Sequence, residues 1–470
     1  MRAHRLTLIF LVALGLACSL AAGAHGDTRM WVGFTDDPKL RFDPDRQPTL
    51  DRVAASHATV VRTVVQWWTT APSRPTDATD PFDPAYHFDD IDELVRNAQS
   101  RGLEIEFAVW GTPSWANGVR SPQYAPTNPV DYQQFMQALA ARYSGRYPGY
   151  PFVRFYGIWN ESNLATFLRP QFDGAGNIVG PTVYARLAVA GLRGVKAGNP
   201  QALVAIGETS SNGRNRHVAG LTDTVAPGTF LERVAKAAPR LKFDAWAQHP
   251  YPFPVAQPPT QKVRWPNVGM TSLPQLESAL DRRFRKGIPI WITEYGNETK
   301  PGEPKGVTEK QQATYLPQAI AIARKDPRVK MFIWFVFQDS AGSPWQSGLY
   351  RLDGSGKRAA GVWANAVAPL DMRNGSVSAP AGTVDPVVTV YLRNFCNNNA
   401  LGAAVGTTTR VFLSGELVGV TQAQLPLAID CTVRVELPVR VATKSTYVAT
   451  VDLNTSAGNT ATRTFTVVGR

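Results

Sequence analysis

Cysteine, histidine clusters and long apolar runs are scarce in this 470-residue chain, and each scarcity excludes a class of protein. Its 3 cysteines and 6 histidines have no zinc-type spacing, so the sequence predicts no metal site. After the N-terminus, no segment is apolar over the roughly 20 residues that a membrane-spanning helix needs. With 44% hydrophobic and 18% charged residues, the composition is typical of a globular protein rather than a disordered one.

Acidic residues are also few, since 37 Asp and Glu stand against 49 Lys and Arg. The formal net charge of +12 would suit an anionic partner such as a cell-wall polymer or an acidic polysaccharide. The alternative is that the positive charge only solvates the surface. No run of Lys and Arg alternates with aromatic residues, so nucleic acid is not predicted as a partner.

Residues 1–24 have the pattern of a secretory signal peptide. A basic start precedes an apolar run, residues 6–16, and Ala22-Gly23-Ala24 supplies small residues for cleavage. That run is too short to span a membrane, which takes about 20 residues. We therefore expect a secreted, extracellular protein without stable membrane insertion. Association with the cell wall is left open, and a lipid anchor at Cys18 is an alternative to cleavage.

Removal of this signal would leave two cysteines, Cys396 and Cys431, both near the C-terminus. Because disulfides form and persist outside the cell, we expect these two residues to pair.

From residue 28 to residue 372, short apolar runs alternate with amphipathic stretches. Eight runs are predicted as strands: 30–33, 60–65, 105–109, 152–159, 202–206, 243–247, 288–293 and 331–336. Helical patterns lie at 91–101, 132–143, 184–197, 230–237, 273–284, 309–324 and 361–368. Eight strand–helix units close most naturally into a (β/α)₈ TIM barrel, so the predicted fold class is α/β.

Beyond residue 376 the helical period disappears and runs of period two replace it. These predict strands at 387–391, 410–413, 433–437, 447–453 and 462–468. Short strands with one disulfide predict a small all-β, immunoglobulin-like sandwich as an accessory domain, residues 376–470. All 12 tryptophans precede this region, so a structural or spacer role is expected, with sugar binding as the alternative.

Active sites of such barrels lie at the carboxyl ends of the strands, and a glutamate follows the end of two predicted strands, Glu161 after 152–159 and Glu294 after 288–293. The other polar or aromatic residues predicted at these ends are Asp36, Asp37, Gln66, Trp67, Trp68, Trp110, Asn160, Glu208, His249, Tyr251, Tyr295, Gln338 and Asp339. Aromatic faces and carboxylates suit a sugar cleft, and two facing carboxylates can cleave a glycosidic bond. Periodicity alone does not select which two of the six carboxylates act.

Two motifs carry a resemblance to a known group of enzymes. Tyr156-Gly157-Ile158-Trp159-Asn160-Glu161 and Ile292-Thr293-Glu294-Tyr295-Gly296 resemble those of clan A retaining glycoside hydrolases. That clan places an Asn-Glu acid/base after the fourth strand and a glutamate nucleophile after the seventh. The resemblance covers residues 30–345, and Asn163-Leu164 with Phe167-Leu168-Arg169-Pro170 is most similar to families 39 and 5, the cellulase-like barrels.

The resemblance implies that Glu294 is the nucleophile and Glu161 the acid/base of a double displacement. It also implies that Asn160 binds the sugar 2-hydroxyl. The further substrate-binding candidates are Arg62, His249, Tyr251, Trp334 and Trp110. Arg62 would keep Glu294 ionised, and His249 or Tyr251 would orient Glu294. Trp334 would lie beneath a sugar, and Trp110 lies at a strand end.

Each of these residues also has a structural alternative. Arg62 could be an ion-pair partner, His249 before Pro250 could shape a loop, and Trp334 could pack in the core. Ser162 stands where many relatives have proline, which changes the stiffness of that loop.

The leading interpretation is a secreted retaining O-glycosyl hydrolase that cleaves β-linked bonds of a polysaccharide or oligosaccharide. A catalytically inactive carbohydrate-binding barrel of the cell surface is the alternative, and a scaffolding or cell-wall protein is a third. The chemistry requires no cofactor or metal, and a monomer is the default expectation.

Overall fold

The computed structural model describes residues 30–343, 345–367, 370–378, 387–394, 405–425, 432–438, 446–455 and 460–468. The predicted signal peptide and both Cys396 and Cys431 lie outside these residues. Within the described ranges, no helix combines the length and the apolar character needed to cross a membrane.

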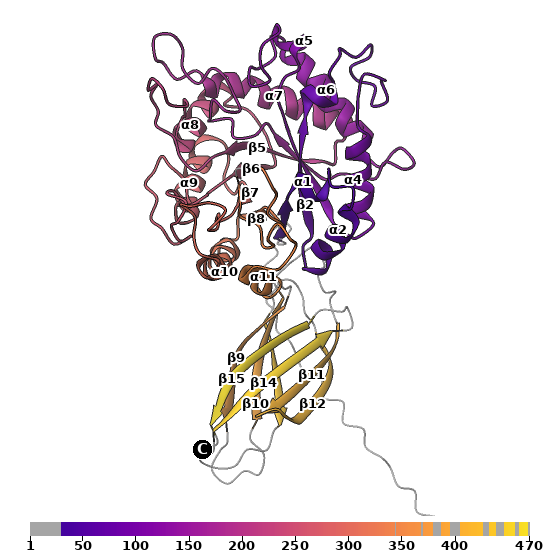
Figure 1. The fold of residues 1–470 in the computed structure, drawn as a ribbon, viewed down its shortest axis with the longest axis vertical. Coiled ribbons are helices and arrows are strands. Elements are labelled where there is room, and N and C mark those ends of the chain that lie inside the picture. The colour runs from indigo at the N-terminus through magenta and orange to yellow at the C-terminus, as the bar shows by residue number, and fades with distance from the viewer. Residues whose placement is uncertain are drawn as a thin grey trace, which may run out of the picture.

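Eight parallel strands, β1 to β8, close into a barrel in sequence order (Figure 1). Their bounds are β1 Trp31–Thr35, β2 Val60–Gln66, β3 Glu104–Trp110, β4 Phe155–Ile158, β5 Leu203–Thr209, β6 Ala245–Gln248, β7 Ile290–Tyr295 and β8 Val329–Phe335. Pairing of β1 with β8 closes the barrel. Every predicted strand overlaps one of these eight, so the (β/α)₈ prediction is confirmed.

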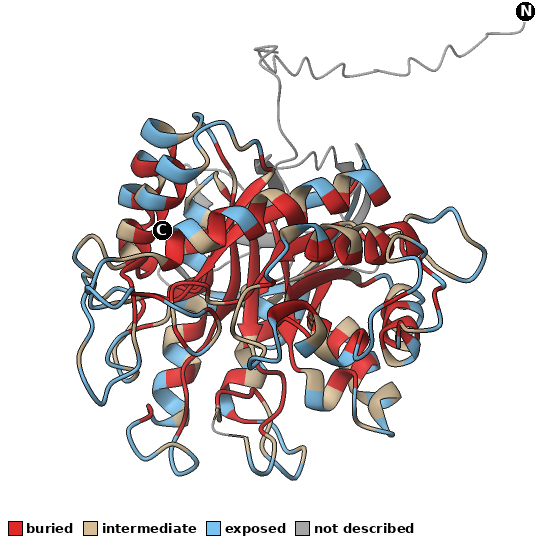
Figure 2. Ribbon diagram, turned by 90° about the horizontal axis from the view of Figure 1, so that it is seen from above, coloured by how far each residue is buried: buried red, intermediate tan, exposed pale blue. Residues whose placement is uncertain are grey.

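Helices surround the barrel, with their inward sides buried and their outward sides exposed (Figure 2). They are α1 Asp37–Leu40, α2 Arg46–Ala55, α3 Trp67–Thr70, α4 Asp89–Gln99, α5 Ser114–Asn117, α6 Pro129–Arg142, α7 Gly180–Gly198, α8 Pro227–Ala237, η1 Met270–Ser272, α9 Leu273–Arg283, α10 Glu309–Lys325 and α11 Arg358–Val367. The predicted helical patterns correspond to α4 and α6 to α11. Sequence patterns missed α2, because only Leu50 and Val53 of its residues are buried.

Local capping fixes where several helices begin. The Asn128 side chain accepts a hydrogen bond from the Val130 N–H, and Pro129 opens α6. Thr308 and Gln311 form a reciprocal capping box at the start of α10. These caps end the loops that follow β3 and β7, and so limit how far those loops extend over the barrel.

Side chains inside the barrel form two layers of opposite character. The layer near the amino ends of the strands is apolar: Trp31, Val60, Phe155, Ala205, Ala245, Ala247, Trp291, Met331 and Ile333. Because side chains alternate along a strand, residues two places further on also point inward. Arg62, His249 and Thr293 stand two places beyond residues of that layer and form, with Glu106 and with Glu208 after an irregularity of β5, a polar layer that is completely buried. The interior of the barrel is thus a packed core whose upper half carries charge.

The C-terminal strands are β9 Leu370–Ser378, β10 Val387–Asn394, β11 Val405–Leu413, β12 Glu416–Leu425, β13 Thr432–Pro438, β14 Thr446–Thr455 and β15 Thr460–Val468. They form one sheet of order β13-β10-β9 and another of order β12-β11-β14-β15. The five predicted strands correspond to β10, β11, β13, β14 and β15. β9 spans the predicted boundary between residues 372 and 376.

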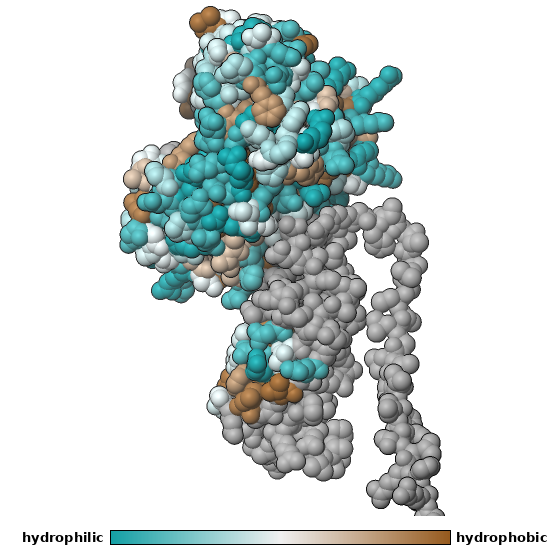
Figure 3. Space-filling view, turned by 90° about the vertical axis from the view of Figure 1, so that its right-hand side faces the viewer, coloured by the Kyte–Doolittle hydropathy of each residue, from teal (hydrophilic) through white to brown (hydrophobic). Residues whose placement is uncertain are grey.

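The surface of the barrel is mostly hydrophilic, as the face in Figure 3 shows. Large apolar side chains are exposed at separate places, among them Phe42, Phe82, Leu221 and Phe253. Scattered apolar residues of this kind are normal on soluble proteins. Phe253 differs from the others because it borders the cavity described next.

Candidate active site

A cavity of about 540 Å³ lies at the carboxyl ends of β4 to β8. It is lined by Glu161, Leu164, Thr166, Phe167, Ser210, Ser211, Asn212, Thr222, Thr224, Tyr251, Pro252, Phe253, Val255, Glu294, Phe335 and Trp345. Glu161 and Glu294 are the charged members of this lining, and the rest is hydroxyl, amide or apolar.

Glu161 and Glu294 face each other across the ring of His249. The His249 Nδ1 lies 3.2 Å from Glu161 Oε1 and 3.5 Å from Glu294 Oε2. One oxygen of each carboxyl group and this ring nitrogen lie within 4.8 Å of one another. Glycosidases whose carboxyl groups are about 5 Å apart act directly on the sugar, whereas a gap of about 6.5–9.5 Å leaves room for a water.

Both oxygens of Glu294 accept hydrogen bonds. Arg62 Nη1 donates to Oε1 at 2.8 Å, and the Tyr251 hydroxyl donates to Oε2 at 3.0 Å. Burial and the charge of Glu294 raise the pKa of Tyr251 well above its ordinary value, so the phenol keeps its proton. The Glu294 carboxylate is therefore fixed in orientation, with 11% of its side chain exposed to the cavity.

Arg62 is completely buried and contacts side chains from four other strands or strand ends. Its Nη2 donates to Asn160 Oδ1 at 2.9 Å and lies 3.4 Å from Glu208 Oε2. Its Nε lies 3.1 Å from Glu106 Oε2. Burial lowers the pKa of Arg62, but the charges of Glu294, Glu208 and Glu106 outweigh this effect and raise it. Arg62 therefore stays charged at the centre of the cluster.

Glu161 differs from Glu294 in its surroundings. Burial raises the pKa of Glu161, the hydrogen bond and charge of His249 lower it, and the charge of Glu294 raises it, with a net upward shift. The site therefore holds one carboxyl group biased toward its acid form beside a carboxylate held by two donors. Such a pair can supply an acid and a nucleophile.

His249 is fully buried and bridges three carboxyl groups. Its Nε2 lies 3.0 Å from Glu208 Oε2 and 3.1 Å from Thr293 Oγ1. Burial lowers the pKa of His249, but Glu294, Glu161 and Glu208 raise it to about 10. The ring is therefore a donor on both nitrogens at neutral pH. Glu161, His249 and Glu294 are also the group that the described residues bring close enough to hold a metal ion, but a protonated imidazole is not a metal ligand.

The backbone at the ends of β4 and β5 adopts the left-handed region at three non-glycine residues. The φ angles are +73° at Trp159, +34° at Glu161 and +45° at Glu208. Such conformations cost on the order of 1–3 kcal/mol each and cluster at functional sites. Trp159 is held in place because its N–H donates to the Val109 carbonyl at 2.9 Å and its indole donates to the Phe167 carbonyl at 2.9 Å.

Comparison with known protein families identifies the barrel. Residues 31–339 match the family model described as cellulase (glycosyl hydrolase family 5). The chain belongs to this family. It is therefore an O-glycosyl hydrolase, and the predicted resemblance to clan A is confirmed. A comparison with curated proteins found no match.

Solved structures of other glycoside hydrolases share the fold. A family 39 glycoside hydrolase from the gut symbiont Bacteroides cellulosilyticus WH2 has a TM-score of 0.54 and 18% identity, over 88% of this chain and 82% of that one. A family 5 subfamily 18 protein from Streptomyces cattleya, in complex with GlcNAc, has a TM-score of 0.53 and 18% identity, over 72% and 80%. The family 39 enzyme from Xanthomonas axonopodis pv. citri has a TM-score of 0.53 and 13% identity, over 89% and 93%.

Two of the six predicted carboxylates, Glu161 and Glu294, line the cavity of this glycoside hydrolase, and Glu208 is fully buried outside its lining. The other three make contacts elsewhere. Asp36 Oδ2 accepts from the Gln338 N–H at 2.9 Å. Asp37 accepts from a backbone N–H of β2 at 3.0 Å. Asp339 pairs with Lys357 at 2.6 Å. These contacts hold the loops after β1 and β8. Of the six candidate catalytic carboxylates, Glu161, Glu208 and Glu294 therefore remain.

The prediction for Trp334 is wrong. Its side chain is fully buried in the core outside the barrel wall, and its indole donates to the Ser347 carbonyl at 2.9 Å. Ile333 points into the barrel, so alternation turns Trp334 outward and Phe335 inward. Phe335 lines the cavity in its place.

Trp110 lies beside the cavity rather than in its lining. It is partly buried and packs edge-on against Trp68 and Phe167, with ring centroids 4.9 and 5.0 Å apart. Phe167 itself lines the cavity. Ser162 is fully buried and donates to the Gly207 carbonyl at 2.9 Å, which ties the end of β4 to β5.

Sequence reasoning missed Phe335 and Glu106. The alternation of β8 could have found Phe335. Glu106 could have been found as a carboxylate inside an apolar strand, because it pairs in register with Arg62 of β2.

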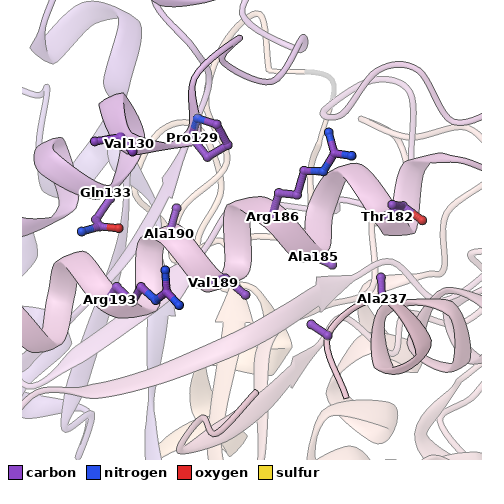
Figure 4. Close-up of a pocket in the computed structure, with 11 residues that line it drawn as sticks. Pro129, Val130, Gln133, Thr182, Ala185, Arg186, Val189, Ala190, Arg193 and Ala237 are labelled. Carbon is purple, nitrogen blue, oxygen red and sulfur yellow. The ribbon is translucent and has the colours of Figure 1, made fainter. Parts of the chain in front are cut away.

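Another cavity, of about 520 Å³, lies on the outer side of the barrel between α6, α7 and α8. Figure 4 shows Arg186 and Arg193 of α7 and Val130 and Gln133 of α6 among the side chains that line it. Its lining has no carboxyl group. The cavity at the strand ends differs from it because Glu161 and Glu294 line it.

Proposed function

We propose that the protein is a secreted retaining glycosidase that hydrolyses β-linked polysaccharides or oligosaccharides through a glycosyl-enzyme intermediate. The observation that carries the proposal is the pair of carboxyl oxygens of Glu161 and Glu294, within 4.8 Å of each other in a family 5 barrel. This separation suits direct attack by a carboxylate and is too short for an interposed water.

In this mechanism Glu294 attacks the anomeric carbon while Glu161 donates its proton to the leaving oxygen. The glycosidic C–O bond breaks and an ester to Glu294 forms. Esterification removes the negative charge of Glu294, which had raised the pKa of Glu161. Glu161 then becomes a stronger acid whose carboxylate takes a proton from water, and the water oxygen displaces Glu294.

Asn160 and Arg62 would act together on the substrate. The Asn160 Oδ1 accepts from Arg62, which leaves the amide NH₂ as the group that donates to the sugar 2-hydroxyl. Arg62 and Tyr251 would hold Glu294 in line for attack, and His249 would hold Glu161 and Glu294 apart.

A neutral glycan is the proposed substrate class. Apart from the two glutamates, the lining offers hydroxyl and amide groups from Ser210, Ser211, Asn212, Thr222 and Thr224 and aromatic faces from Phe335 and Trp345. An acidic sugar would meet the Glu294 carboxylate with no cation in the lining, which would repel it.

The proposal extends to the whole chain as an extracellular monomer that binds no nucleic acid. Antiparallel pairing within two sheets, with β9 against β15 and β12 against β13, supports an immunoglobulin-like sandwich as the accessory domain. The expected Cys396–Cys431 bridge would close it.

The test is sugar release by residues 25–470 from neutral polysaccharides and β-aryl glycosides, with Glu161→Ala and Glu294→Ala beside the wild type. Glu232→Ala, on α8, is the matched control. We expect both site variants to lose turnover, azide to restore Glu161→Ala as a β-glycosyl azide, and NMR to show β-configured first products. An inverted product would overturn the mechanism, and glycan binding without turnover by the wild type would support the inactive alternative.

A further inference from the structure

Six ionisable groups share the buried upper layer of the barrel and the floor of the cavity. They are Arg62, Glu106, Glu161, Glu208, His249 and Glu294, and none of their side chains is more than 16% exposed. Four ionised carboxylates would face two cations, a net charge of −2 out of water. Uncompensated buried charge is costly, so the cluster favours two further protons. The proposed mechanism places one on Glu161 and leaves the other unassigned.

Glu208 and Glu294 are poor sites for that second proton. Glu208 Oε2 lies 3.0 Å from the protonated His249 ring and accepts from Thr293 at 2.9 Å. Burial raises the pKa of Glu208, but His249 and Arg62 outweigh burial and lower it. Glu294 accepts from Arg62 and Tyr251. Glu208 therefore favours its carboxylate form, and each oxygen of Glu294 already accepts a hydrogen bond.

Glu106 has the opposite surroundings. It is completely buried on β3, and neither of its oxygens has a hydrogen-bond partner among the described residues. Its closest cation is the Arg62 Nε at 3.1 Å, and that guanidinium is shared with two other carboxylates.

Gly157 leaves the space in which Glu106 and Glu208 approach each other. A Cβ atom at Gly157 would lie 2.4 Å from Glu208 Oε1 and 2.7 Å from Glu106 Oε1. Both oxygens are buried and lack a partner among the described residues. A neutral acid beside a carboxylate is stable in such a space, whereas two carboxylates repel each other.

We propose that Glu106 is a neutral carboxylic acid in the folded enzyme and that it positions Arg62 beneath the nucleophile. The Glu106 Oε2 atom lies 3.1 Å from Arg62 Nε, and an oxygen of a neutral acid does not compete for the positive charge. The charge of Arg62 then remains available to Glu294 and Glu208. The positioning role rests on the proposed function of Glu294, whereas the location of the proton does not.

The groups that face Glu106 are Arg62 of β2, Glu208 of β5, His249 after β6 and Glu294 of β7. Burial raises the pKa of Glu106 to about 8, with Arg62 opposing and Glu208 adding to the shift. Between its ordinary value of 4.5 and about 8, the folded state holds a proton that the unfolded state has lost. Stability therefore falls as pH rises across this window and is insensitive to Glu106 above it.

Thermal unfolding from pH 4.5 to pH 9 tests the proton without reference to activity. Glu106→Gln cannot ionise, so we expect its melting temperature to rise relative to the wild type as pH increases to about 8. Glu104→Gln is the matched control, because Glu104 starts the same strand and pairs with Arg154 instead. It should follow the wild type in parallel. At pH 6.5, the infrared difference between wild type and Glu106→Gln should contain the carbonyl band of a protonated acid. Parallel melting curves with no such band would overturn the proposal.

Kinetics test the positioning role. Glu106→Leu removes the carboxyl group that lies 3.1 Å from Arg62 Nε, and loss of a polar contact to a charged group costs about 10–100-fold. We expect that loss in kcat rather than KM, and substantial rescue by Glu106→Gln, which keeps a carbonyl oxygen beside Arg62. A Glu106→Leu variant as active as Glu104→Gln would overturn the role, as would a folded Glu106→Gln as impaired as Glu106→Leu. An inactive wild type would defeat the proposed function, while unfolding and infrared would still locate the proton.

Discussion

The two layers inside the barrel differ in almost every property although they are neighbours along the strands. In the lower layer Phe155 packs edge-on between Trp31 and Trp291, with ring centroids 5.1 and 5.3 Å apart. In the upper layer two cations and several carboxyl groups are equally buried. Burial of the apolar lower layer stabilises the fold, whereas desolvation of the charged groups in the upper layer destabilises it. The lower layer therefore contributes mainly to stability, and the upper layer holds the ionisable groups on which the proposed mechanism depends.

The strongest test of the upper layer is the isosteric change Glu294→Gln. It removes the attacking carboxylate but keeps the shape of the side chain and a carbonyl acceptor for Arg62, while its NH₂ group can donate to the Tyr251 oxygen, so folding should persist. We expect kcat on an aryl glycoside to fall on the order of 10⁵-fold, as for loss of other covalent nucleophiles. Circular dichroism would confirm the fold. Residual activity near that of the wild type would remove Glu294 from the mechanism.

Arg62→Met should lower both the hydrolytic activity and the stability of the fold. It leaves Glu106, Glu208 and Glu294 without their shared cation, and breaking a buried ion pair costs about 3–5 kcal/mol. We expect a decrease of this size in the free energy of unfolding, measured with urea, and loss of most hydrolysis. An active, fully stable variant would show that the cluster does not depend on Arg62.

Met331→Ala supplies the matched change in the lower layer. Met331 is fully buried, and a Met-to-Ala change in a core costs about 2–5 kcal/mol. Unfolding in urea should show this loss, while kcat/KM at a temperature where the variant is folded should stay within about threefold of the wild type. A large kcat defect without a stability loss would contradict the separation of the two layers.

Sequence patterns were sufficient for the barrel, because it depends on local periodicity. They placed six carboxylates near strand ends, and the resemblance to clan A, rather than periodicity, singled out Glu161 and Glu294 as the predicted catalytic pair. These patterns were insufficient for Trp334, where the inward position of Ile333 along β8 decides which aromatic side chain meets the cavity. Glu106 was missed because one glutamate within an apolar run resembles an interruption until the register with Arg62 is known. The loops after β4, β5 and β6 form walls of the cavity, and their positions depend on long-range packing that local sequence patterns do not predict.

The protonated state of His249 gives a smaller, pH-dependent effect. Its pKa is raised from 6.5 to about 10 in the folded state, so its stabilising contribution is complete below 6.5 and is lost as pH rises through about 10. We expect the melting temperature of the wild type to fall between pH 8 and pH 10, above the window of Glu106. His249→Gln should be less stable at pH 7 and should show a flatter decline across that range. Parallel curves would mean that the ring is neutral.

The smallest predicted effect concerns Phe253, at the rim of the cavity. Its side chain is 60% exposed, so it is not held there by packing in the core, and a sugar ring could stack on its face. Loss of an aromatic contact is worth about 0.5–1.5 kcal/mol, so Phe253→Ala should raise KM about 2–10-fold and leave kcat nearly unchanged. Phe82→Ala is the matched control, because Phe82 is 44% exposed and does not line the cavity. An unchanged KM in Phe253→Ala would place the substrate on the Phe335 and Trp345 side of the two glutamates.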